Sequence, residues 1–167
     1  MDPVSVFRAQ ASANRASGIL IDRQGQFWHE HQQVTHEGFR RALFAWLDRL
    51  PHPDGRYILR IDEDRFVFID VQDTPLVARS LRWEANVDKR ALVMSLTDGS
   101  DETLDVDTVT YDQEGTLRAM VKNGRLEARL STAAMSTLAA YLHESQDGWQ
   151  LVFPDGSVTI LRARTSP

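Results

Sequence analysis

The chain lacks cysteine altogether and has no long hydrophobic run among its 167 residues. Without cysteine there is no disulfide framework, no zinc site built from thiolates and no cysteine nucleophile. No apolar stretch approaches the roughly 20 residues that a helix needs to span a bilayer, and no basic start precedes an apolar segment of signal-peptide length. The sequence therefore predicts a soluble, cytoplasmic protein without a membrane span.

An excess of basic charge is also missing. The chain carries 19 Lys and Arg residues against 24 Asp and Glu residues, its net charge is −5, and neither half has a basic tail. Proteins that bind duplex nucleic acid owe much of their affinity to neutralised phosphates. We therefore expect no duplex nucleic acid among the partners, although a local basic patch is still able to hold a small anionic ligand.

Catalytic signatures are absent as well. No serine lies in a nucleophile elbow, and no glycine-rich loop follows a strand in the pattern that cradles phosphates or a dinucleotide. The acidic run Asp62-Glu63-Asp64 is interpreted as a hydrated turn rather than as a pair of catalytic carboxylates. The sequence predicts a protein that is not an enzyme and that uses no cofactor.

What the sequence does contain is a repeated order of predicted elements. Each copy reads strand, strand, helix, strand, strand, the first starting near Ile19 and the second near Leu117. The offset is about 96 residues through both helices, so that Trp46 corresponds to Leu142, and it shifts by a few residues at the following Asp-Gly turn. The alternative is that two amphipathic helices flanked by hairpins agree by chance.

The repeat and the turn signals predict an α+β protein with two lobes divided near Pro75. Residues 1–75 form the N-terminal α+β lobe, which consists of a short leader helix and the first repeat. Residues 76–167 form a C-terminal antiparallel β lobe with one packed helix, because strand patterns separated by glycine-containing turns fill the stretch 76–130. We expect this lobe to be a bent antiparallel sheet or a partial barrel.

Two helices of the first lobe have recognisable start signals. The pair Asp2-Pro3 predicts a helix from Val4 to Ala16, with aspartate as the cap and proline at the first helical position. Thr35 is the predicted cap of the second helix, whose apolar stripe includes Trp46. Because it lies on that stripe, Trp46 is interpreted as a core side chain and not as a stacking platform for a ligand.

A hairpin around Asn123-Gly124 carries the one candidate binding surface. This dipeptide favours a two-residue type I′ turn, which fixes the register of the two strands and sets like charges opposite one another. One face of the hairpin is then entirely apolar, and the other is basic with Glu127 as its single acid. The basic residues are Arg118, Lys122, Arg125 and Arg129.

Opposed like charges are mildly destabilising, so the basic face needs an anionic neighbour. One explanation is internal, since the stretch from Asp98 to Glu114 contains seven acids and no Lys or Arg. The other is a small anionic or nucleotide-like ligand held by charge-assisted hydrogen bonds. On the second explanation we expect a non-catalytic binding or sensing module with its ligand between the lobes; a protein–protein interaction module without a small ligand is the alternative.

Histidines supply a third hypothesis. His29, His31 and His36 lie close together, with Glu30 among them. In a strand His29 and His31 share a face, which is a spacing that metal ligands use, so a metal-dependent hydrolase is the third alternative. No third ligand is placed by the sequence, and a capping role explains His36, so the favoured interpretation is structural histidines without a metal.

Several motifs, taken together and in order, resemble an uncharacterised bacterial family, the domain of unknown function 1285. They are Gly18-Ile19-Leu20-Ile21, Phe27-Trp28-His29-Glu30, Asp54-Gly55-Arg56-Tyr57, Val71-Gln72-Asp73-Thr74-Pro75 and Asp147-Gly148-Trp149. The resemblance implies a duplicated α+β core whose C-terminal half is similar to a pleckstrin-homology-like fold. It also implies a small-ligand site where the halves meet and a part in signal transduction, with no catalytic residues.

Overall fold

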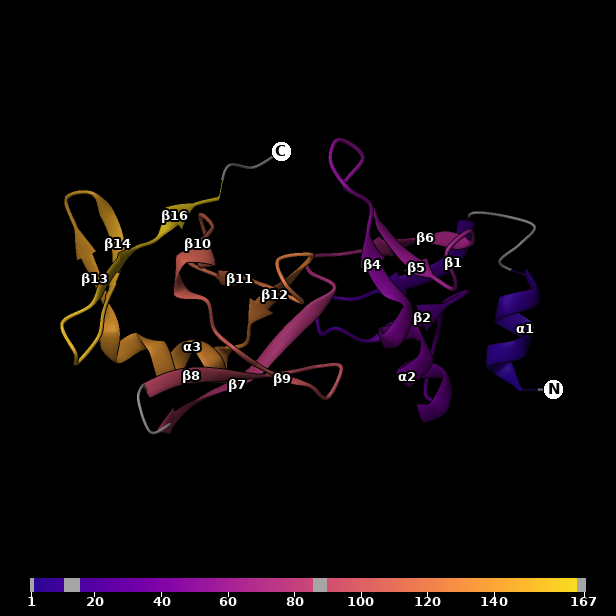
Figure 1. Ribbon diagram of the computed structural model, residues 1–167, viewed down its shortest axis with the longest axis horizontal. Helices are drawn as coiled ribbons and strands as arrows, with labels where there is room; N and C mark the ends of the chain where they lie inside the picture. Colours follow the sequence, from indigo (N-terminus) through magenta and orange to yellow (C-terminus); the bar gives the residue numbers. More distant parts are fainter. Residues whose placement is uncertain (1, 11–15, 86–89, 165–167) are drawn as a thin grey trace. The chain divides into compact units, whose positions relative to one another are not determined.

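A computed structural model describes residues 2–10, 16–85 and 90–164 (Figure 1). The chain divides into two compact units, Met1–Pro75 and Leu76–Pro167. The first unit is built on a six-stranded sheet, and the second on a seven-stranded sheet and a three-stranded sheet. The predicted α+β class with two lobes is confirmed. None of the described helices combines the length and the apolar character needed to cross a bilayer.

The N-terminal unit contains two helices and six strands. In chain order they are α1 (Pro3–Gln10), β1 (Ala16–Ile21), β2 (Phe27–His29), β3 (Gln32–Gln33), α2 (Glu37–Trp46), β4 (Leu47–Arg49), β5 (Tyr57–Arg60) and β6 (Phe66–Val71). The strand order in the sheet is β3-β2-β1-β6-β5-β4, and β1 and β6 are the parallel pair at its centre.

The core of this unit lies between the sheet and α2. Leu43 is fully buried and Trp46 is 8% exposed, which confirms Trp46 as a core side chain. Phe27 of β2 meets Phe44 of α2 edge-on with ring centroids 4.7 Å apart, so the helix is anchored on the sheet. Phe7 of α1 stacks on Trp46 with ring centroids 5.9 Å apart, so α1 packs against α2. Figure 1 shows α1 near the N-terminal end of the chain.

Of the two predicted helix caps, the structure bears out Asp2 but not Thr35. The Asp2 carboxylate accepts a hydrogen bond from the Ser5 amide at 3.2 Å, so Asp2 acts as a cap, but β1 already begins at Ala16 and residues 11–15 of the predicted helix lie outside the described part. The predicted Thr35 cap of α2 is wrong. His36 is the N-cap, and its Nδ1 accepts from the Phe39 amide at 3.1 Å.

The C-terminal unit is mostly β. Its elements are β7 (Leu76–Ala85), β8 (Arg90–Leu96), β9 (Asp101–Thr103), the 3-10 helix η1 (Val106–Thr108), β10 (Thr110–Tyr111), β11 (Leu117–Val121), β12 (Leu126–Leu130), α3 (Thr132–Leu138), the 3-10 helix η2 (Ala139–Tyr141), β13 (Leu142–Ser145), β14 (Gly148–Val152), β15 (Val158–Ile160) and β16 (Arg162–Ala163). The seven-stranded sheet has the order β16-β10-β11-β12-β7-β8-β9, and β13-β14-β15 form the small sheet.

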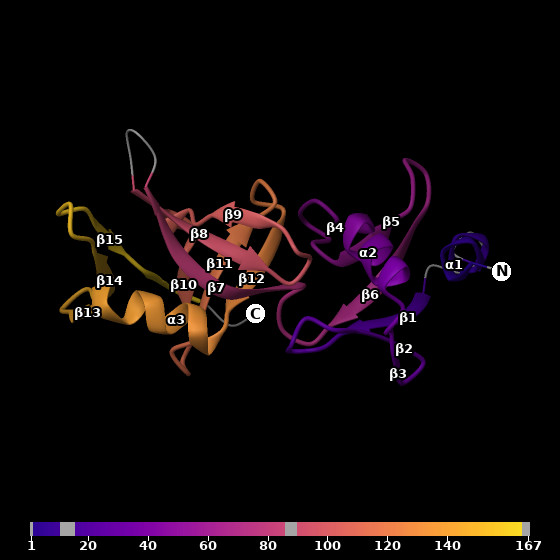
Figure 2. The ribbon, with the colours of Figure 1, turned by 90° about the horizontal axis from the view of Figure 1, so that it is seen from below.

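The large sheet is mixed rather than antiparallel throughout. Strands β12 and β7 are parallel, as are β10 and β16. The difference arises from the stretch 104–109, which carries the chain from β9 at one edge to β10 near the other edge, a crossover that antiparallel hairpins never make. A pairing irregularity between Ala78 and Ser80 in β7 adds to the bend of the sheet, and α3 covers β7 and β12 (Figures 1 and 2).

The repeated order of elements recurs, but its strand pairing does not. A hairpin (β1–β2 or β11–β12), a helix (α2 or α3) and three antiparallel strands (β4–β6 or β13–β15) follow one another in each unit. In the first unit β6 pairs with β1 and completes one sheet. In the second unit the three strands form a separate sheet, and the hairpin pairs with β7 and β10 instead. The first strand after each helix, β4 or β13, was not predicted from the sequence.

Candidate functional site

The hairpin of β11 and β12 has the register that its turn predicts. Arg118 lies opposite Arg129 and Met120 opposite Glu127. Asn123 and Gly124 have φ values of 57° and 75°, the left-handed pair that a type I′ turn requires. The apolar face is buried in the sheet, with every side chain at most 2% exposed: Leu117, Ala119, Val121, Leu126, Ala128 and Leu130.

The polar face of this hairpin belongs to a longer row that crosses four strands. Thr110 of β10 is the partner of Arg118 in β11 and of Arg162 in β16, and Arg118 is in turn the partner of Arg129 in β12. Directly paired residues of neighbouring strands point to the same face of a sheet. Three arginines and one threonine therefore stand side by side, and we call them the arginine row.

A depression of about 290 Å³ is lined by three members of this row, Thr110, Arg118 and Arg162, whereas Arg129 lies outside the lining. We call it the Arg118 depression. Its lining joins η1 and all four strands that carry the row, and it combines guanidinium, carboxylate and hydroxyl groups with one thioether. The lining residues are Asp107, Thr108, Thr110, Arg118, Ala119, Met120, Glu127 and Arg162.

Arg118 is the buried centre of the row. The residue is 8% exposed, and its Nη1 donates to Asp112 Oδ2 at 2.5 Å. Its Nε lies 3.9 Å from Glu127, whose carboxylate also pairs with Arg164. Burial of Asp112 opposes its charge, but the hydrogen bond from Arg118 and backbone donors hold the pKa of Asp112 below its ordinary value. The Arg118 guanidinium is thus fixed in place by carboxylates.

Lys122 lies away from the row, at the end of the hairpin. Its Nζ lies 2.7 Å from Asp98 and 2.9 Å from Glu102, and it donates to Ser100 Oγ at 2.7 Å. Burial works against the charge of Lys122, but these two carboxylates raise its pKa. The contacts join the hairpin to β9 and to the turn between β8 and β9, and because β12, β7 and β8 separate β11 from β9 in the sheet order, the sheet must bend for them to form.

The structure therefore separates the four basic residues that the sequence grouped together. Arg118 and Arg129 share the arginine row, whereas Lys122 and the exposed Arg125 lie at the turn. Arg118 and Lys122 have carboxylate partners from the acidic stretch, as the internal explanation required. Sequence reasoning missed Arg162, and the signal was the alternation of Arg162 and Arg164 after the last apolar strand.

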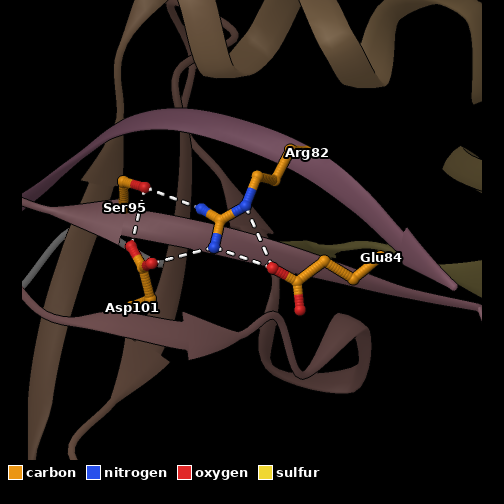
Figure 3. A network of polar contacts seen from close by, with 4 residues as sticks. All are labelled: Arg82, Glu84, Ser95 and Asp101. Carbon is orange, nitrogen blue, oxygen red and sulfur yellow. Dashed lines mark hydrogen bonds and ion pairs between the residues drawn. The ribbon is translucent and has the colours of Figure 1, made fainter. Parts of the chain in front are cut away.

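Asp101, another member of the acidic stretch, accepts hydrogen bonds from Arg82 and Ser95 where β7, β8 and β9 lie side by side (Figure 3). Arg82 donates to Asp101 at 2.8 Å, to Ser95 at 2.9 Å and through two nitrogens to Glu84, and Ser95 donates to Asp101 at 2.7 Å. The hydrogen bond from Arg82 lowers the pKa of Asp101 and raises that of Arg82 itself. This exposed network ties three neighbouring strands together.

The structure does not place His29 and His31 on one strand face, as the metal hypothesis requires. Glu30 and His31 have φ values of 47° and 67° and form the two-residue turn between β2 and β3, so His31 does not share a strand face with His29. His36 is engaged as the α2 cap. In the part of the chain that the structure describes, no group of three or more His, Cys, Asp or Glu side chains is placed to hold a metal ion.

The fold has solved counterparts. A DUF1285 family protein from Silicibacter pomeroyi DSS-3 matches with a TM-score of 0.69 and 19% identity, over 96% of this chain and 87% of its own. A DUF1285 family protein from Shewanella baltica OS155 matches with a TM-score of 0.59 and 17% identity, over 76% and 94%. The protein has the fold of these DUF1285 proteins. The resemblance seen in the sequence is confirmed at this level, and these neighbours indicate no catalytic family. The sequence matches no protein-family model and no curated protein.

Proposed function

We propose that the C-terminal unit is a non-catalytic binding module that holds a small ligand by an anionic group in the Arg118 depression. The observation that carries the proposal is the arginine row, which aligns Arg118, Arg129 and Arg162 across neighbouring strands. Guanidinium groups bind carboxylates and phosphates through paired, charge-assisted hydrogen bonds. Occupancy of such a site by a metabolite is a simple basis for a sensing role.

Preorganisation supports this assignment. Asp112 and Glu127 hold the central guanidinium of Arg118, so a ligand does not have to order that side chain when it binds. Thr110 stands between Arg118 and Arg162 in the row, where its hydroxyl is available as a neutral donor. The module therefore offers charge and hydrogen bonding on rigid strands rather than on a loop.

The size of the depression sets the size of the ligand. Sites for drug-sized molecules enclose roughly 300–1,000 Å³, and the depression has about 290 Å³. This favours a carboxylate or a phosphate monoester of few atoms over a whole nucleotide. In this proposal Lys122 and Arg125, at the end of the hairpin, contribute positive potential rather than direct contacts.

A titration monitored by nuclear magnetic resonance tests the proposal. Inorganic phosphate and acetate are added to the ¹⁵N-labelled protein, and we expect saturable shifts at the amides of Thr110, Arg118 and Met120. The variant Arg162→Gln should weaken binding about tenfold, as expected for loss of one charge-assisted contact, and Arg129→Gln, which alters a row member outside the lining, should weaken it less. Arg82→Gln is the matched control, because it removes a guanidinium from the separate β7–β9 network.

Two results would speak against the proposal. The first is the absence of saturable shifts with either anion, which would favour the competing function of a protein-interaction module without a small ligand. The second is equal weakening by Arg82→Gln and Arg162→Gln, which would mean that the anions follow overall charge and not the arginine row.

A further inference from the structure

We infer that the Arg118 depression selects a small zwitterion, a ligand of the α-amino acid class whose carboxylate and ammonium groups are held by opposite charges of the protein. The inference rests on the proposed function and narrows it to one class of ligand. It comes from two charged residues of the lining: Asp107 of η1, which has no role in the proposed function, and Arg162 of β16, which belongs to the arginine row.

The other charges around the depression are already engaged. Arg118 pairs with Asp112, and Glu127 pairs with Arg164. Asp107 and Arg162 differ from these. Both are exposed, both line the depression, and within residues 2–10, 16–85 and 90–164 neither side chain takes part in an ion pair or a hydrogen bond.

Asp107 and Arg162 also do not pair with each other, although they line the same depression. Opposite charges that stay apart in one concave site are able to accept a ligand that carries both complementary groups. A carboxylate on Arg162 gains a charge-assisted hydrogen bond, and an ammonium on Asp107 gains a second one. A simple anion gains only the first of these contacts, and a simple cation only the second, so each should bind more weakly than a ligand that carries both groups.

The neutral part of the lining fits the remainder of such a ligand. The Thr108 hydroxyl is engaged, since it accepts from the Met120 amide at 3.1 Å and donates to the Asp105 carbonyl at 2.7 Å. The Met120 side chain is left as a soft apolar surface for a short aliphatic group. Together with the volume of about 290 Å³, this limits the ligand to one amino acid or a molecule of that size.

Three probes that differ by one charge test the inference. They are L-alanine, propionate, which lacks the ammonium group, and ethylamine, which lacks the carboxylate. Dissociation constants come from resonance titrations of the whole ¹⁵N-labelled chain at millimolar concentrations. We expect L-alanine to bind about tenfold more tightly than either of the others.

One variant at each charged residue tests which group of the ligand that residue binds. Asp107→Asn should bring L-alanine down to the affinity of propionate and leave the binding of propionate unchanged or stronger. Arg162→Gln should weaken the binding of L-alanine and of propionate, which both carry a carboxylate, and leave the binding of ethylamine unchanged. Spectra without probe verify that each variant is folded.

The outcomes distinguish the inference from the function on which it rests. Propionate that binds as tightly as L-alanine, and loses affinity in Arg162→Gln, overturns the zwitterion while the anion-binding function stands. If propionate, L-alanine and phosphate all fail to bind in a way that depends on Arg162, both the zwitterion inference and the anion-binding function are overturned.

Discussion

Arg118 Nη1 lies 2.5 Å from Asp112 Oδ2 in a place where only 10% of the arginine side chain is exposed. Asp112 also accepts hydrogen bonds from the amides of Glu114 and Thr116, both at 2.9 Å, and so closes the turn between β10 and β11. One carboxylate therefore both shapes a turn and neutralises a buried cation. Stability and the arginine row depend on the same group.

Asp112→Asn should lower the free energy of unfolding by about 2 kcal/mol, because the buried guanidinium of Arg118 loses its charged partner. Urea denaturation at neutral pH measures the change. Arg118→Met, which removes the charge together with its need for a partner, should cost less than Asp112→Asn. The reverse order would mean that the pair is not desolvated in solution.

Acid should remove the contribution of the Arg118–Asp112 pair to the free energy of unfolding. The pKa of Asp112 is lower in the folded protein than in the unfolded chain, so the stabilisation is complete above the unfolded pKa of about 3.9 and is lost as the pH falls through the folded pKa. The difference in unfolding free energy between the protein and Asp112→Asn should therefore be constant near neutrality and shrink below about pH 4. A difference that does not change down to pH 2 would refute the coupling.

Lys122 combines a closing contact with a strained backbone, since its φ is 54° and its Nζ bridges Asp98 and Glu102. Lys122→Ala should cost about 2 kcal/mol of unfolding free energy, because it leaves two carboxylates without their cation. Lys122→Gly loses the same contacts but relieves the left-handed conformation, so it should be about 1 kcal/mol more stable than Lys122→Ala. Thermal denaturation of the two variants measures the difference in their stability. Equal stabilities would contradict the prediction that the left-handed backbone at residue 122 is strained.

Substitutions in the turn at Glu30 and His31 should stabilise the protein. Both residues have positive φ values, and Asn-Gly is the preferred dipeptide for such a turn. The double substitution Glu30→Asn and His31→Gly should raise the unfolding free energy by about 1 kcal/mol. His31→Ala is the control, because it removes the imidazole and leaves the strain; stabilisation by that variant would point to the side chain and not to the backbone.

The Arg82 network of Figure 3 should matter little to stability despite its many hydrogen bonds. Its charges are exposed, so water competes for every contact and salt screens them. Arg82→Gln should shift the melting temperature far less than Asp112→Asn, and the small shift should disappear in high salt. A loss as large as that of Asp112→Asn would show that burial is not what distinguishes the two clusters.

Local rules account for what the sequence predicted well. The Asn123-Gly124 turn sets the hairpin register by itself, and an apolar stripe on α2 is enough to place Trp46 in the core. The helix ends were less predictable, because β4 begins directly after α2 with Leu47 in an extended conformation. No capping residue or proline marks that change.

The arginine row was beyond prediction for a physical reason. Arg162 joins Arg118 only through Thr110, in a parallel pair between β10 and β16 that is far from local in the chain. Likewise, Lys122 meets Asp98 only because the sheet bends. The charge pattern pointed to Arg118, Lys122 and the acidic stretch that begins at Asp98 but not to Arg162, and only the strand order decides which of these groups meet.

Strand β7 is the first strand of its unit to be synthesised, yet one of its two neighbours, β12, follows only after β8, β9, β10 and β11, with Leu76 paired to Ala128. Until the ribosome has delivered β12, the flank of β7 facing away from β8 has open backbone groups, which are a template for other chains. Folding of this unit should therefore be slow and vulnerable to truncation, and expression of fragments that stop before residue 126 should yield insoluble protein.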